Sequence, residues 1–206
     1  MSTKRPGLQR GLTLIELIIF MVVMGIAAVA VLQMLNLATK ASADPVRRKQ
    51  ALLLAESYLE EVELARFTYC DPTDPNAATA TGTGQCASGK AEVLGQEAGG
   101  VGRPYDNVSD YSSNGNAQSP QQMFLNGAGQ LSDATGAALP LNGFTVTVAL
   151  DAAPPLGPAT MPIASDLTAA NLRAIHIMIK VVYGSGSNDF VTLDGYRTRY
   201  APNSVP

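Results

Sequence analysis

A long uncharged apolar run near the amino terminus dominates the hydropathy pattern of the chain. Residues 17–39 include no charged side chain over 23 positions, and apolar residues fall on every face of a helix built from them. At 1.5 Å per residue the run would extend about 34 Å, enough to cross a bilayer core of about 30 Å. It therefore predicts a membrane-spanning helix that stays with the mature protein. The alternative is the buried core helix of a soluble domain, which seldom lacks charge over such a length.

A second helical pattern follows the apolar run, and this one is amphipathic. One face carries the apolar side chains of Leu52, Ala55, Leu59 and Val62, and another carries Glu56, Glu60 and Glu63. Asp44 and Pro45 resemble a fresh helix start, because Asp caps free N–H groups and Pro suits the first turn. The sequence thus predicts one long helix from about Leu12 to Phe67, bent near Asp44 and Pro45. The alternative is two separate helices.

The carboxyl-terminal third has the period-two pattern of β-strands. Apolar residues alternate over 144–150 and 175–183, and a Gly/Ser-rich turn at 184–188 leads into a third strand over 189–200. The fold class is therefore α+β, with an antiparallel sheet of three or four strands whose apolar face is covered by the amphipathic helix. The region 76–141 is rich in turn signals, with a short strand expected around 122–125.

Composition and charge exclude several function classes. The net charge is −3, which argues against nucleic acid as a partner, because phosphate contacts need a basic surface. One histidine and two cysteines leave little material for a metal site or a thiol enzyme. His176 lies within a strand pattern, and no nucleophile-elbow or phosphate-loop motif is found. We therefore expect no enzyme activity, no catalytic residue, no cofactor and no metal.

Two pairs of aspartates at expected loop tips are candidate Ca²⁺ ligands. They are Asp71 with Asp74, and Asp189 with Asp194. Their spacing matches no EF-hand, so we expect solvated loop carboxylates.

Glu16 is the most informative single residue. An ionised carboxylate close to an apolar membrane segment is costly without a partner. Thr13 and Glu16 fit the Ser/Thr-x-x-Glu capping box, so a helix start is one interpretation. The other is that Glu16 pairs with a positive charge supplied by another chain.

The residues around Glu16 resemble the amino-terminal signature of the type IV pilin-like family. The resemblance rests on a short basic leader ending in Arg10 and Gly11, then Thr13-Leu14-Ile15-Glu16, then the apolar run. In that family a membrane-bound prepilin peptidase cuts after the glycine and N-methylates the new terminal residue, and the glutamate acts in subunit docking. The resemblance implies cleavage between Gly11 and Leu12, N-methylation of Leu12 and docking through Glu16. The segment 50–62 also resembles minor pilins of the mannose-sensitive haemagglutinin D type and minor secretion pseudopilins.

Cys70 and Cys86 enclose fifteen residues with several turn formers. A disulfide is the default in an exported domain, and closing such a loop stabilises a fold by ~3 kcal/mol in the chain-entropy model. Two reduced thiols are the alternative. A disulfide requires the carboxyl-terminal domain to lie outside the cytoplasm. That requirement orients the anchor, whose two flanks carry nearly balanced basic charge.

The sequence divides into five predicted segments. They are a cleaved cytoplasmic leader 1–11, a transmembrane and assembly helix 12–39, an amphipathic stem 40–68, a variable disulfide-stapled region 69–141 and an antiparallel sheet 142–206.

The resemblance implies a minor type IV pilin, a structural subunit of an envelope filament. Its expected partners are other pilin or pseudopilin subunits, prepilin peptidase, an inner-membrane assembly platform and, before assembly, membrane lipid. It would be a single-pass inner-membrane protein with a periplasmic carboxyl-terminal domain, later part of a pilus or pseudopilus. The alternatives are a minor pseudopilin of type II secretion and a singly anchored periplasmic enzyme or binding protein.

Overall fold

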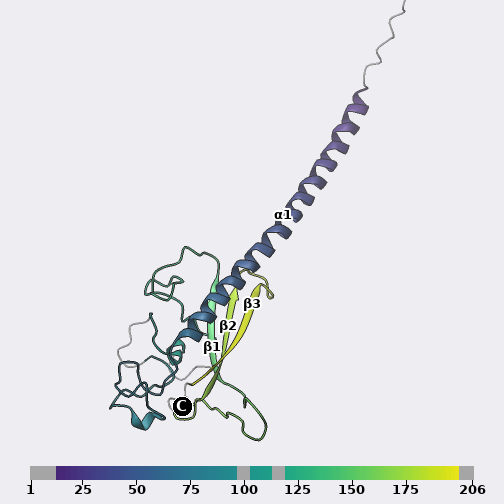
Figure 1. Ribbon diagram of the computed structural model, residues 1–206. Helices are drawn as coiled ribbons and strands as arrows, with labels where there is room; N and C mark the ends of the chain where they lie inside the picture. The colour runs from purple at the N-terminus through teal and green to yellow at the C-terminus, as the bar shows by residue number, and fades with distance from the viewer. Residues whose placement is uncertain (1–12, 97–102, 113–118, 200–206) are drawn as a thin grey trace, which may run out of the picture. The chain divides into compact units, whose positions relative to one another are not determined.

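The computed structural model describes residues 13–96, 103–112 and 119–199, with the side chains of 38–44 left out. Its regular elements are helix α1 (Leu14–Leu64), the short 3-10 turns η1 (Thr83–Gln85) and η2 (Val108–Tyr111), and strands β1 (Thr145–Ala152), β2 (Ala174–Val182) and β3 (Phe190–Thr198) (Figure 1). The chain forms two compact units, Met1–Val46 and Arg47–Pro206, and each is described by itself.

The first unit consists of the amino-terminal part of α1. Its apolar side chains from Leu14 to Leu37 all lie exposed. The helix continues through Pro45 as one element, so the alternative of two separate helices is wrong. The bend expected near Asp44 and Pro45 falls where the two units meet and stays a prediction.

The second unit is built around an antiparallel sheet of three strands in the order β1-β2-β3. Ile177 in the central strand lies opposite Leu150 of β1 and Gly195 of β3. The α+β class, the two period-two segments and the third strand after the Gly/Ser-rich turn are confirmed. The strand expected around 122–125 is wrong, because Gln121 forms a single bridge with Val148 and the chain then turns back at Asn126.

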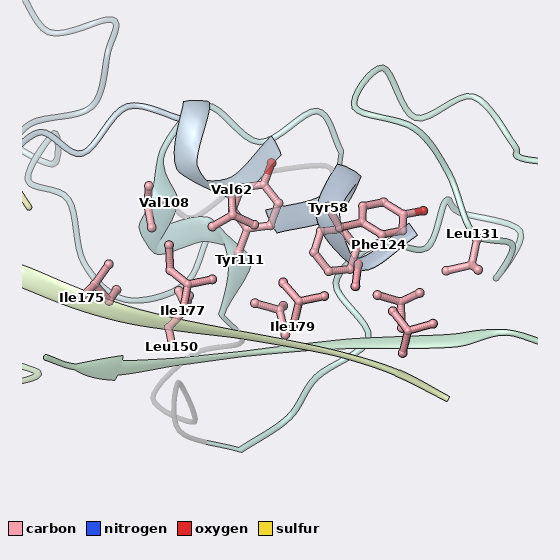
Figure 2. Packing of buried hydrophobic residues seen from close by; sticks show 14 of the residues in the cluster. Tyr58, Val62, Val108, Tyr111, Phe124, Leu131, Leu150, Ile175, Ile177 and Ile179 are labelled. Atoms are coloured by element: carbon pink, nitrogen blue, oxygen red, sulfur yellow. The ribbon is translucent and has the colours of Figure 1, made fainter. Parts of the chain in front are cut away.

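The hydrophobic core lies between the sheet and the second half of α1. Ile175, Ile177, Ile179 and Val181 of β2 are fully buried, as alternation along a strand requires. Figure 2 shows these isoleucines facing Tyr58 and Val62 of the helix, with Phe124 of the long connection beside them. Burying each such side chain contributes about 1.5–3 kcal/mol, so this layer is the main source of stability of the second unit.

The helix face that covers the sheet is shifted from the one expected. The buried residues are Ala51, Ala55, Tyr58 and Val62, whereas Leu52 and Leu59 are half-buried at its margin. Tyr58 stands at the centre because its ring packs on Phe124 at a centroid distance of 4.1 Å, and its hydroxyl donates to the carbonyl of Ser132 at 2.9 Å. Contacts with Phe124 and Ser132, which are distant in sequence, thus place the Tyr58 ring in the core and satisfy its hydroxyl.

Gly195 lets β3 approach the helix closely. A Cβ atom at this position would lie 2.8 Å from Cδ1 of Leu59 and would also collide with Oε1 of Glu63. The missing side chain therefore sets the spacing between the third strand and α1.

Candidate functional site

The predicted processing site precedes the described part of the chain. Gly11 and Leu12 lie outside the described residues, so cleavage between them and methylation of Leu12 stay predictions.

Glu16 stands in the first turn of α1, directly after that site. The Thr13 N–H donates to Oε2 of Glu16 at 3.4 Å, which is the return bond of a capping box, and the Leu17 N–H donates to the Thr13 carbonyl at 3.2 Å. The first of these bonds is long for an N–H···O contact, so it restrains the carboxylate weakly. Glu16 therefore forms part of the helix start. Its carboxylate lies beside the backbone of Thr13, the residue that follows Leu12. Docking through Glu16 stays a prediction.

The surface behind Glu16 is apolar and unshielded. The segment Leu14–Leu37 is long and apolar enough to cross a membrane. Its large side chains range in exposure from 46% for Leu17 to 76% for Leu14. Apolar surface left in water forgoes roughly 25 cal/mol per Å², so this helix needs lipid or neighbouring helices around it. A single amino-terminal apolar helix of this kind fits the membrane anchor of a pilin.

Cys70 and Cys86 are joined in a disulfide, as the sequence analysis expected. The loop they close contains η1 and is held at its base by the Asp71 N–H, which donates to the Lys90 carbonyl at 2.9 Å. Asp74 is buried beside the two sulfurs and accepts the Ala87 N–H at 2.7 Å. Sulfur atoms in a disulfide are not thiolates and do not bind a metal in that way. Cys70, Cys86 and Asp74 therefore form a structural crosslink of the loop.

The aspartates weighed as Ca²⁺ ligands have protein partners. Asp71 accepts from Nζ of Lys90 at 2.8 Å and from Thr73, and these hydrogen bonds lower the pKa of Asp71 to about 2. Asp189 accepts from the Gly186 N–H at 2.7 Å. These carboxylates fasten loops and turns.

His176 lies on the face of the sheet away from α1. Its Nε2 is 2.8 Å from Oδ1 of Asp194, and its ring stacks on Tyr196 with centroids 4.9 Å apart. These contacts fit the expected role of a strand residue bonded to its neighbours.

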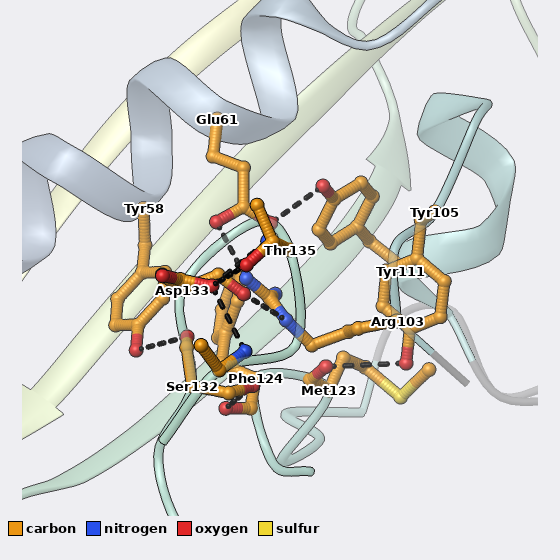
Figure 3. Close-up of polar contacts among 11 residues, drawn as sticks. Tyr58, Glu61, Arg103, Tyr105, Tyr111, Met123, Phe124, Ser132, Asp133 and Thr135 are labelled. Atoms are coloured by element: carbon orange, nitrogen blue, oxygen red, sulfur yellow. Dashed lines mark hydrogen bonds and ion pairs between the residues drawn. The ribbon is translucent and has the colours of Figure 1, made fainter. Parts of the chain in front are cut away.

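Sequence reasoning missed a buried polar cluster that fastens the long connection to the helix. Nη2 of Arg103 lies 2.7 Å from Oε2 of Glu61, the Tyr111 hydroxyl donates to Oε1 of Glu61 at 2.7 Å, and Nε of Arg103 donates to the Asp133 carbonyl at 3.0 Å (Figure 3). The Arg103 side chain is only 1% exposed. Burial raises the pKa of Tyr58 to about 12 and, together with the bond to Glu61, raises that of Tyr111. No local pattern joins these residues, because they lie 42 and 50 positions apart.

A groove of about 540 Å³ runs along the helix beside this cluster. Its walls include Leu64 of α1 with Tyr105 and Leu139 from the connection. Two polar residues that line the groove, Glu61 and Tyr111, are hydrogen-bonded to each other. The groove is therefore a surface feature of the packing between helix and connection.

Comparison with known proteins supplies one finding. Residues 7–32 match the family model of the prokaryotic N-terminal methylation motif. No curated protein and no solved structure matches the chain. The matched residues include Gly11, Leu12 and Glu16 and extend into the apolar helix. The amino terminus thus carries the class III leader and methylation motif of type IV pilin-like precursors, the substrates of prepilin peptidase, and the described chain behind it has the α+β layout of a pilin.

Proposed function

We propose that this protein is a minor type IV pilin, a structural and non-catalytic subunit of an envelope filament. In this proposal the leader stays in the cytoplasm, the apolar part of α1 spans the inner membrane, and the second unit lies in the periplasm. The Cys70–Cys86 disulfide supports that side of the membrane, because disulfides persist in oxidising compartments. A minor pseudopilin of type II secretion would use the same residues and is the second candidate.

One observation supports the proposal most directly. A carboxylate, Glu16, lies in the first turn of an unshielded apolar helix, inside a matched methylation motif. In a membrane or a bundle of apolar helices such a charge is costly unless a cation meets it.

Cleavage between Gly11 and Leu12 would supply that cation. The cut frees the α-amino group of Leu12, and N-methylation keeps its positive charge. The ammonium of one subunit and the Glu16 carboxylate of the next would form a charge-assisted hydrogen bond in a low-dielectric setting. Such a head-to-tail contact does not close on itself, so repetition builds a helical filament. Contacts with lipid are then exchanged for contacts between helices.

The cut is tested by replacing Gly11. Gly11→Val should leave the precursor full-length in the membrane, as measured by the intact mass of the purified protein. A mature form of normal mass, beginning at Leu12, would refute the cleavage site.

The docking role is tested at Glu16. Glu16→Ala should be cut normally yet be lost from the sheared filament fraction. Glu16→Gln is the matched control, since the amide oxygen can still accept the Thr13 N–H while the charge is gone. If Glu16→Gln enters filaments as well as the wild type does, the side chain serves the helix start alone.

A further inference from the structure

Three potential metal ligands meet in the loop region that follows α1. The sulfurs of Cys70 and Cys86 and a carboxylate oxygen of Asp74 all lie within 4.8 Å of one another. In the part of the chain that the structure describes, no other three cysteine, histidine or acidic side chains come this close together. While the disulfide is intact, its sulfurs do not act as thiolates. The same three side chains gain a different chemistry when the sulfurs are reduced.

The two ends of the loop are held together by backbone contacts as well as by the disulfide. Cys70 forms an antiparallel bridge with Ala91, and beside it the Asp71 N–H donates to the Lys90 carbonyl at 2.9 Å. These contacts join the segment before the loop to the segment after it, and they do not involve a sulfur atom. The two cysteines therefore stay near each other when the disulfide is reduced.

The Asp74 carboxylate is oriented by backbone N–H groups. Its Oδ1 accepts the Asn76 N–H at 2.8 Å, and its Oδ2 accepts the Ala87 N–H at 2.7 Å. Ala87 directly follows Cys86, so the second bond ties the carboxylate to the far cysteine. Asp74 is only 4% exposed, and each oxygen of an ionised carboxylate has a second lone pair. Hydrogen bonds of this kind orient a carboxylate that binds a metal.

The donor set of two thiolates and one carboxylate suits Zn²⁺. Zinc binds cysteine sulfur at about 2.3 Å and carboxylate oxygen at about 2.0–2.2 Å, in tetrahedral geometry. Two sulfurs on one zinc ion lie roughly 3.8 Å apart, a separation that side-chain rotation supplies between Cα atoms 5.4 Å apart. Three protein ligands leave the fourth position for water. Cys86 is partly exposed, so the site has a path to solvent.

We propose that Cys70, Cys86 and Asp74 of the reduced chain bind one Zn²⁺ ion, and that this state competes with the disulfide. The chain is made with both cysteines as thiols, since thiols are kept reduced in the cytosol. Zinc binding releases the two thiol protons and leaves both sulfurs as thiolates. Disulfide formation instead passes two electrons and two protons to a partner disulfide, which becomes a dithiol. Both reactions use the same sulfurs, so each excludes the other, whatever the function of the chain.

The zinc content of the full chain in detergent tests the site. The chain is reduced with a phosphine under nitrogen, mixed with ZnCl₂ and desalted, and its metal content is then measured by mass spectrometry. We expect stoichiometric zinc in the reduced chain and almost none in a sample whose disulfide was left intact. Equally low zinc in the two samples would overturn the proposal.

Ligand variants separate this site from loose binding of zinc to any thiol. Asp74→Asn keeps both sulfurs but should bind Zn²⁺ about tenfold or more weakly, as measured by competition with a zinc-sensitive dye. Asp166→Asn is the matched control, because the Asp166 carboxylate also accepts a backbone N–H, from Thr168 at 2.8 Å. The double variant Cys70→Ser with Cys86→Ser should retain no zinc. If Asp74→Asn and Asp166→Asn bind zinc equally well, Asp74 is not a ligand and the proposal is wrong.

The kinetics of oxidation test the competition on the unaltered chain, so this test does not require any variant to fold. The reduced chain is mixed with excess oxidised glutathione, and the remaining thiols are counted over time with a maleimide. ZnCl₂ should slow the loss of thiols several-fold, whereas MgCl₂ should not, because Mg²⁺ prefers oxygen ligands. The same rate of thiol loss with the two salts would overturn the proposal.

Discussion

Two glutamates of α1, Glu61 and Glu16, differ in how strongly their carboxylates are already hydrogen-bonded within the chain, and so in their capacity to bind another chain. Glu61 accepts from both Arg103 and Tyr111 at 2.7 Å, so both of its oxygens are used inside the second unit. Glu16 receives the Thr13 N–H at 3.4 Å. The shorter and charge-assisted bonds are the stronger ones. Glu16 is therefore the acid that can exchange its hydrogen bond for an intermolecular ion pair at little cost.

The buried pair of Arg103 and Glu61 yields a prediction about stability. Arg103→Met keeps the volume but removes the cation, leaving Glu61 in a site that is 14% exposed. Breaking a buried pair in this way costs about 3 kcal/mol. Thermal unfolding of the full chain in detergent, followed by tyrosine fluorescence, measures the loss. Arg103→Lys retains the charge and should lose less; an equal loss for the two variants would mean that geometry, not charge, dominates.

Asp71 yields a prediction about pH. Its pKa is held at about 2 by hydrogen bonds from Lys90 and Thr73, against about 3.9 in an unfolded chain. A lowered pKa in the folded state adds stability above pH ~4, and that stability is lost as pH falls toward 2. Asp71→Asn lacks this contribution. Its melting temperature should lie below that of the wild type at pH 7, and the gap should narrow between pH 4 and pH 2. If the difference in melting temperature between wild type and Asp71→Asn stays the same from pH 7 to pH 2, it comes from packing and not from the ionisation of Asp71.

At the scale of elements, what could be predicted follows from local periodicity. The strands around Val148 and Ile177 could be predicted because apolar residues alternate along them, and the strand around Leu193 because a Gly/Ser-rich turn leads into it. The apolar helix could be predicted from another local signal, a continuous run of apolar residues without charge. The expected processing residues Gly11 and Leu12 and the expected docking residue Glu16 lie in a motif that the family model also matches, and their roles stay predictions.

Elements that depend on distant partners could not be predicted. Tyr58 takes the centre of the helix face because its hydroxyl reaches Ser132, 74 residues away. Gln121 pairs with β1 through a single bridge. Because the residues next to it are not part of a strand, they show no alternation of apolar and polar side chains. The acidic face with Glu56 and Glu60 follows from the sequence pattern, whereas the exposure of Leu53 and Leu64 beside it cannot be inferred from spacing alone.

The close approach of β3 to α1 yields a prediction for Gly195. Gly195→Val would drive its methyl groups into Leu59 and Glu63. Overpacking of this kind costs about 1–3 kcal/mol. Gly127→Val is the control, because nothing lies within 4 Å of a Cβ there. The two melting temperatures should differ clearly, and similar values would show that β3 moves aside freely.

At the scale of the whole molecule, an apolar helical unit is joined to a unit with its own core. The first unit has no buried side chain among its described residues, whereas the second holds the core cluster. We expect alkaline carbonate to leave the full chain in the membrane pellet and detergent to release it. A chain of residues 47–206 should be soluble in the same fractionation. Release of the full chain by carbonate would contradict the anchor.

The long connections of the second unit also constrain when it can fold. Nη1 of Arg199 donates to the Thr68 carbonyl at 2.7 Å, across 131 positions of the chain. β3, the strand that lies against Leu59, comes long after α1 in the order of the chain. Contacts this distant form slowly and late. The buried face of α1 therefore stays uncovered until β3 has been made and has reached it. Under the proposed function, the membrane anchor would hold such incomplete molecules apart in the meantime.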